Sequence, residues 1–195
     1  MDNMVEKRAE TDGGLEPVGP FRKGPTFITS GHRPIHPIRK ERIDRAVSRM
    51  LSEGVEEDID LNICVRSIDG FYSFPDGEKF SNIPKVELAD VIDFDPTREV
   101  FIIRGETKPD ISSEIIWFAF KALEGYNYLC VMSIGGEWPM DIPRKPDERI
   151  DLGLNIAKRW NENRSFALNG YRYIKSNDIE DIVDEIIDSS VQKSQ

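Results

Sequence analysis

Short apolar runs alternate with amphipathic stretches along most of this sequence, and that alternation constrains the fold more than any other feature. Runs of strand length are separated by turn signals such as Asp69-Gly70, Pro96 and Asn169-Gly170. The run at residues 128–133 is apolar throughout, which is typical of a central strand. The predicted strands cover residues 59–66, 71–74, 91–95, 100–103, 128–133, 166–168 and 171–174.

Four segments with helical apolar spacing lie between or after these strands. The first begins near Pro37 and ends before Gly54, and its buried stripe contains Ile43, Val47 and Met50. The other three cover residues 115–123, 150–160 and 179–187. Strands mixed with covering helices predict an α/β fold, a three-layer α/β/α sandwich with a central mixed or antiparallel sheet.

Helix caps can also be predicted from the sequence. Ser112 or Ser113 is placed to cap the second helix. Asn177 with Glu180 has the spacing of a capping box for the last helix. Both motifs predict side-chain bonds to the first backbone N–H groups of these helices.

The domain organisation follows from length and local composition. A chain of 195 residues accommodates one domain with a core of its own. Residues 1–25 are rich in glycine and proline and poor in aliphatic side chains, so we expect a flexible N-terminal arm. Residues 26–195 are expected to form a single domain.

Charge and cysteine usage exclude several classes of function. Lys and Arg number 26 against 36 Asp and Glu, so the formal charge is −10 and a nucleic acid is not an expected partner. No apolar run reaches the length of a membrane span, and the first residues have no apolar segment typical of a secretory signal. The two cysteines, Cys64 and Cys130, lie in apolar runs and predict buried free thiols in a reducing, cytoplasmic location.

Four short motifs with polar residues occur in the chain, two within predicted elements and two in turns between them. Asn62 and Arg66 lie in the first strand, and Pro75-Asp76-Gly77 forms a turn. The segment 108–114, with sequence Lys-Pro-Asp-Ile-Ser-Ser-Glu, opens a helix, and Asn169-Gly170 forms a late turn. Together with the order of elements over residues 39–187, these motifs resemble the class II aldolase/adducin family.

The resemblance implies a site. In that family an Asn in the first motif, the residues of the turn and two serines hold phosphate, which assigns ligand binding to Asn62, Asp76, Gly77, Ser112 and Ser113. The acid/base glutamate of the family corresponds to Glu114. Asp76 departs from the family pattern, since a carboxylate repels phosphate.

The zinc ligands that the resemblance implies are absent from this chain. Active family members hold zinc with three histidines, two at the end of a strand and one in a late turn. By position, Ser133, Gly135 and Asn169 stand there, and no histidine follows His36. These residues are poor zinc ligands, so no metal and no cofactor are expected.

Three functions remain open from the sequence, and the last of them is a structural protein with no pocket in use, which a filled cleft around Asn62 and Ser113 would favour. The first is a domain without lyase activity that binds a small polar metabolite, phosphorylated or carboxylated, or that serves as an oligomeric interaction domain. The alternative is an active sugar-phosphate aldolase or epimerase with a relocated metal or a metal-free mechanism, in which His32 or His36 reaches Glu114. The family resemblance also implies a homo-oligomer.

Each candidate residue also has a purely structural interpretation. Glu114 can complement the dipole of its helix, and Ser112 and Ser113 can act only as caps. Asn62 can bond a neighbouring turn. Trp138, in a loop rich in glycine and proline, can be a packing anchor or a lid over a ligand.

Overall fold

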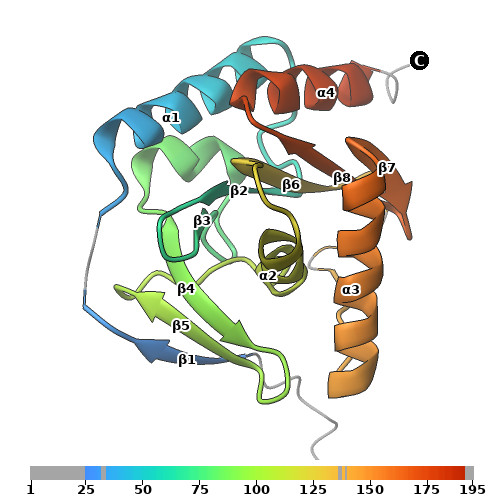
Figure 1. Cartoon of the computed structure of the whole chain (residues 1–195). Coiled ribbons are helices and arrows are strands. Elements are labelled where there is room, and N and C mark those ends of the chain that lie inside the picture. Colours follow the sequence, from blue (N-terminus) through green and yellow to red (C-terminus); the bar gives the residue numbers. More distant parts are fainter. Residues whose placement is uncertain (1–24, 32–33, 136–137, 139, 192–195) are drawn as a thin grey trace, which may run out of the picture.

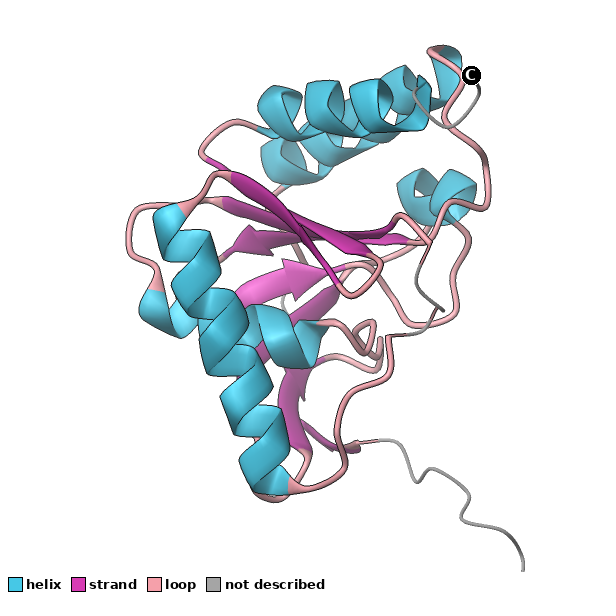
Figure 2. Ribbon diagram, turned by 90° about the vertical axis from the view of Figure 1, so that its right-hand side faces the viewer, coloured by secondary structure: helices cyan, strands magenta, loops and turns pink. Residues whose placement is uncertain are grey.

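The computed structural model describes residues 25–31, 34–135, 138 and 140–191. Its centre is a mixed sheet of eight strands between two layers of helices (Figures 1 and 2). Neighbouring strands are antiparallel except at one edge, where β1 pairs with β5 in parallel. In sheet order the strands are β1 (Thr26–Thr29), β5 (Val100–Arg104), β4 (Ala89–Asp95), β3 (Phe71–Ser73), β2 (Leu61–Arg66), β6 (Tyr128–Ser133), β8 (Tyr171–Ser176) and β7 (Ser165–Leu168).

The helices divide between the two faces of the sheet. One face is covered by α1 (Pro37–Ser52), α4 (Ile179–Val191) and the short 3₁₀ helix η1 (Phe80–Lys85). The other face is covered by α2 (Ser113–Ala122) and α3 (Pro146–Glu162). Each face has its own apolar core, so the predicted three-layer α/β/α sandwich with a mixed sheet is confirmed.

The alternation of side chains along β2 explains how one strand serves both cores. Ile63 and Val65 pack under α1 and α4, whereas Cys64 belongs to the core under α2 and α3. Asn62 points to the same side as Cys64 and is completely buried. The sequence therefore places one polar residue under the start of α2, where it needs partners.

The predicted strands and helices are confirmed, and Ser112 is the N-cap residue of α2 as predicted, but its cap bond and the capping box of α4 do not form. The Ser112 side chain makes no cap bond to α2. Asp110 Oδ1 instead accepts from the Ser112 N–H at 2.8 Å and from Ser112 Oγ at 2.6 Å. At α4, Asp178 Oδ1 accepts from the Glu180 N–H at 3.3 Å, and Asn177 Oδ1 is occupied by the N–H of Asn127. Nearby residues compete for each cap, and local sequence does not decide the competition.

The structure does not describe most of the predicted N-terminal arm, residues 1–25. Residues 1–24 lie outside the described residues, while Thr26–Thr29 form the edge strand β1. Cys64 and Cys130 are buried free thiols. In the described part of the chain, no helix combines the length and the apolar composition that crossing a membrane requires.

Candidate functional site

The first predicted site residues meet beneath the N-terminus of α2. Asn62 reaches up from β2, and its Nδ2 donates to Ser112 Oγ at 3.0 Å and to Ser113 Oγ at 3.3 Å. The three side chains come from two motifs about 50 residues apart, so the predicted convergence is real. None of the three has any exposed surface.

A third serine closes this group of residues. The carbonyl oxygen of the Asn62 side chain accepts from the N–H of Phe74 at 3.0 Å and from Ser73 Oγ at 3.2 Å. Ser73 Oγ and Ser113 Oγ lie 2.7 Å apart and share a further hydrogen bond. We call Asn62, Ser73, Ser112 and Ser113 the Asn62 cluster. Its donors and acceptors bind one another, and the cluster joins β2, β3 and α2.

Asp110 extends the Asn62 cluster toward the solvent. Its carboxylate holds Ser112 as described, and the residue is only 5% exposed. Burial raises the pKa of Asp110 from 3.8 to about 6, and the charges of Asp76 and Asp60 act in the same direction, against the bonds from Ser112. Asp110 is therefore a group whose protonation changes near neutral pH.

The predicted turn lies next to Asp110. Gly77 has a φ of +69°, which favours glycine, and the Asp76 N–H donates to the carbonyl oxygen of Lys108 at 3.0 Å. A β-bridge between Pro75 and Pro109 fixes the turn against the segment that leads into α2. The turn and the segment 108–114 thus meet, as the resemblance implies.

A cavity of about 410 Å³ opens beside this turn. Four carboxylates and one lysine lie along it, with aromatic and aliphatic side chains between them, so we call it the acidic cavity. Negative charge in the cavity disfavours a phosphate and favours a neutral or cationic group. Its lining includes Asp58, Asp60, Leu61, Phe74, Gly77, Glu78, Lys79, Asp110 and Trp138.

Glu114 points away from the Asn62 cluster. It is 3% exposed, and its Oε2 lies 3.3 Å from Nε of Arg149 on α3. Arg149 is itself 1% exposed and also binds Glu99 and the carbonyl oxygens of Pro96 and Arg144. Glu114 therefore takes part in a buried ion pair that joins α2 to α3.

The three positions that correspond to histidines lie where β6 ends and in the turn between β7 and β8. Ser133 ends β6, and the next N–H, that of Ile134, donates to the carbonyl oxygen of Gly170 at 2.8 Å in the β7–β8 turn. That bond brings the end of β6 and the β7–β8 turn, which contains Asn169, close together. A hydroxyl, a glycine and an amide do not fit zinc, which takes thiolate, imidazole or carboxylate ligands. Among the residues that the structure describes, no group of three His, Cys, Asp or Glu could hold a metal ion.

The histidines and Trp138 have separate locations. His36 is exposed and caps α1, where its Nδ1 accepts from the N–H of Ile38 at 3.3 Å. Its helix covers the face of the sheet opposite to the helix that carries Glu114. His32 lies outside the described residues. Trp138 borders the acidic cavity, with its ring centroid 6.4 Å from that of Tyr171.

Three residues of the site escaped the sequence prediction, although each had a signal. Ser73 lies on the same face of its strand as Phe71, two residues earlier, and so points toward α2. Asp110 precedes Ser112 by two residues, a spacing typical of Asx turns. Arg149 falls on the buried stripe of α3 with Gly153, Ile156 and Trp160, which predicts a buried charge.

Comparisons with known proteins address the fold. The sequence matches no protein-family model and no curated protein. Among solved structures, L-fuculose-1-phosphate aldolase from Thermus thermophilus superposes with a TM-score of 0.53 at 14% identity, over 80% of this chain and 93% of that one. YgbL, a proposed aldolase/epimerase/decarboxylase from Klebsiella pneumoniae, gives 0.57 at 11% identity, over 78% and 86%. The chain has a class II aldolase-like fold.

The class II aldolase-like fold confirms the resemblance at the level of architecture. At these identities the comparisons establish the fold and leave the chemistry to the residues themselves. The residues of this class II aldolase-like domain differ from the expected pattern at the Asn62 cluster, whose polar groups are internally bonded. They also differ at the positions of the zinc ligands, where Ser133, Gly135 and Asn169 replace the histidines expected from the resemblance.

Proposed function

We propose that this protein is a class II aldolase-like domain that has lost the zinc site and the lyase reaction, and that it binds a small polar molecule in the acidic cavity. The observation that carries the proposal is the place where the end of β6, at Ser133, meets the Asn169-Gly170 turn. The end of β6 and the β7–β8 turn lie together there, and their side chains offer no ligand that zinc prefers. Stabilisation of an enediolate by a metal has no support at this position.

The Asn62 cluster also supports a role other than lyase. A phosphate cradle needs donors that face a ligand, whereas Asn62, Ser112 and Ser113 have no exposed surface and bind one another. We therefore assign these three residues to the support of the acidic cavity, through Ser112 and Asp110. The Pro75–Gly77 turn forms part of its wall.

The charges that line the acidic cavity limit the kinds of ligand that it can bind. Asp58, Asp60 and Asp110 bring negative charge to a space large enough for a small metabolite, and Lys79 is the only cation among its described lining residues. We propose a neutral or amino-bearing polyol here in place of the phosphorylated or carboxylated metabolite expected from the sequence. Trp138 supplies an aromatic surface for a ring or a cation.

A charge series on one carbon skeleton tests this proposal. Binding of fructose, fructose 1-phosphate and 1-amino-1-deoxyfructose is measured by titration calorimetry on the full chain. We expect the amino sugar to bind best and the phosphate worst, with the preference reduced in Asp58→Asn/Asp60→Asn. Tightest binding of fructose 1-phosphate would contradict the proposed cavity chemistry.

The alternative function is an active sugar-phosphate aldolase or epimerase. A retro-aldol assay with L-fuculose 1-phosphate and added zinc tests it, because that substrate is named for one structural neighbour. We expect no turnover by the full chain. Turnover that disappears in Glu114→Gln would establish the enzyme and refute the loss of lyase activity.

Assembly and location complete the proposal. We propose a homo-oligomer on the strength of the fold resemblance, and light scattering during size-exclusion chromatography measures its mass. We also propose a reducing, cytoplasmic location. The buried free thiols of Cys64 and Cys130 support it.

A further inference from the structure

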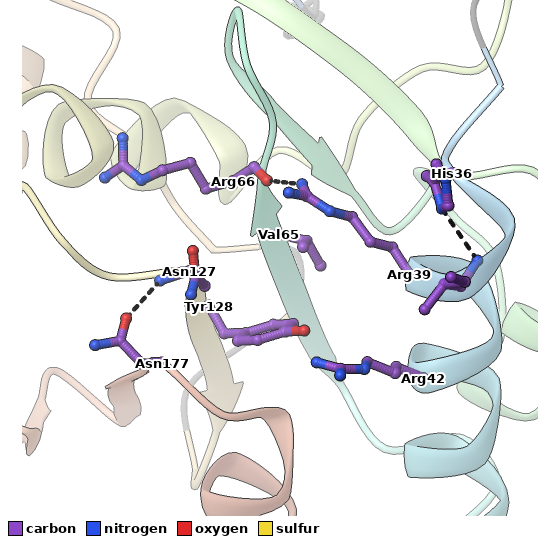
Figure 3. Close-up of a pocket in the computed structure, with 9 residues that line it drawn as sticks. His36, Arg39, Arg42, Val65, Arg66, Asn127, Tyr128 and Asn177 are labelled. Carbon is purple, nitrogen blue, oxygen red and sulfur yellow. Dashed lines mark hydrogen bonds between the residues drawn. The ribbon is translucent and has the colours of Figure 1, made fainter.

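A second cavity, of about 400 Å³, lies at the opposite ends of β2 and β6 from the Asn62 cluster (Figure 3). Its walls are the N-terminal half of α1, the end of β2, the start of β6 and Asn177 before α4. We call it the arginine cavity. Its described lining contains three arginines and no carboxylate, in a chain whose formal charge is −10. The lining includes His36, Arg39, Arg42, Arg66, Asn127, Tyr128 and Asn177.

The three arginines differ in how they are used. The Arg66 guanidinium turns away, toward the carbonyl oxygens of Phe120, Leu123 and Tyr126, where it stabilises the end of α2. Arg39 Nη1 donates to the carbonyl oxygen of Arg66, and this is the only bond its side chain makes within the described residues. Arg42 has no ion pair and no side-chain hydrogen bond in the part of the chain that the structure describes. The side chains of Arg39 and Arg42 are therefore two exposed cations without a carboxylate partner among the described residues.

Tyr128 places a hydroxyl donor next to the arginines of this cavity. The residue is only 5% exposed, and its hydroxyl makes no hydrogen bond within the described residues. Figure 3 shows its ring extending from β6 toward α1, with the hydroxyl end facing the side of the cavity that carries Arg42. The ring is buried while the hydroxyl end reaches the cavity beside the arginines, where it can donate to a bound anion.

We propose that the arginine cavity binds a small molecule through a phosphate or carboxylate group. Arg39 and Arg42 would supply charge-assisted hydrogen bonds to the anion, and Tyr128 would donate a third. The amides of Asn127 and Asn177 line the cavity as further neutral donors. The proposal is independent of the function assigned to the acidic cavity.

An adjoining cavity indicates what kind of group the ligand carries next to its anionic group. It has about 390 Å³, shares His36 and Arg39 with the arginine cavity, and is otherwise lined mainly by Pro34, Ile35, Ile68 and Tyr72. Ile68 is 82% exposed, so an apolar group placed there would bury apolar surface. We therefore expect an anionic ligand with an apolar group next to its charge to bind more tightly than the bare anion.

Titration calorimetry on the full chain tests the proposal with inorganic phosphate, phenyl phosphate and benzoate. We expect phenyl phosphate to bind more tightly than inorganic phosphate, and the comparison with benzoate separates phosphate from carboxylate recognition. Arg42→Gln and Arg39→Gln should each weaken phenyl phosphate by about tenfold, and Tyr128→Phe by about threefold. Arg45→Gln removes the same charge from the same helix outside this cavity and should weaken it less than about twofold.

A second measurement locates the bound anion. Amide chemical shifts recorded during the phenyl phosphate titration should change at Asn127, Tyr128 and Asn177. Changes confined to residues 58–79 would overturn the proposal, because they would place the anion in the acidic cavity. Equal weakening by Arg42→Gln and Arg45→Gln, or no binding of any probe at millimolar concentration, would overturn it as well.

Discussion

Polar side chains gather at both ends of β2 and β6. At one end they bind one another, and at the other end they face a cavity. At one end Asn62 bonds with three serines, and every member of the cluster is buried. At the other end Arg42 and the Tyr128 hydroxyl have no partner within the described residues. A polar group that is bonded inside the protein stabilises the fold, and one that faces a cavity without a partner is available for a ligand. Polar spacing in the sequence shows where residues meet and does not show which of these two states they adopt.

The largest expected change in stability comes from removing the hydrogen bonds of the Asn62 cluster. Asn62→Ala removes the centre of the Asn62 cluster and leaves the Phe74 N–H and the surrounding serines without their partner. We expect the free energy of unfolding to fall by about 3 kcal/mol, measured by urea denaturation. Asn127→Ala is the matched control at the other end, where the side chain is exposed, and should change stability by less than about 0.5 kcal/mol.

The next prediction concerns the dependence of the free energy of unfolding on pH, which reports on Asp110. Its pKa is about 6 in the folded protein against 3.8 for an ordinary aspartate, so the folded state binds the proton more tightly. The stability that this proton gives is present below about pH 4 and is lost as the pH rises through about 6. One pKa unit corresponds to about 1.4 kcal/mol, so the loss approaches about 3 kcal/mol.

Asp110→Asn provides the comparison for this pH effect. Relative to the variant, the natural protein should become less stable between about pH 4 and about pH 7, as measured by urea denaturation at each pH. A stability difference that stays constant over this range would show that the Asp110 pKa is not raised.

A smaller effect is expected from Ser73. Ser73→Ala removes the bonds to Asn62 and Ser113 but keeps the backbone, so we expect a loss of about 1–2 kcal/mol. A double-mutant cycle with Ser113→Ala separates the contribution of their shared bond. If the two single losses simply add, the two serines do not act as parts of one network.

The smallest effect is predicted at the open end. Tyr128→Phe removes a hydroxyl that has no partner among the described residues, so the free energy of unfolding should change by less than about 0.5 kcal/mol. Thermal unfolding of the two proteins measures it. A loss as large as that of Ser73→Ala would mean that the hydroxyl is bonded inside the protein and that the contrast between the ends is false.

The sequence predicts most of the fold because its patterns are local. The turn at Asn169-Gly170 illustrates this point, since both residues have a positive φ that these two residue types tolerate, and the hairpin forms as expected. Ser112 is the N-cap residue of α2 as expected, but Asp110 binds its hydroxyl, and at α4 Asp178 makes the bond expected of Asn177. Tertiary contacts, such as the bond from Asn127 to Asn177, decide which side chain makes such a bond.

The candidate site could be predicted only in part. The resemblance implies the convergence of Asn62, Ser112 and Ser113, yet their internal bonding depends on Ser73, which no motif singled out. The orientation of Glu114 depends on Arg149, which lies later in the chain on another helix. Such pairings are set by the packing of α2 against α3, which sequence spacing does not specify.

The zinc content of the purified full chain tests the central claim most directly. The protein is incubated with zinc, dialysed against buffer without chelator and analysed for bound metal. The donor chemistry of Ser133, Gly135 and Asn169 predicts no stoichiometric zinc. One zinc ion retained per chain would contradict the account and restore the lyase reaction as the leading function.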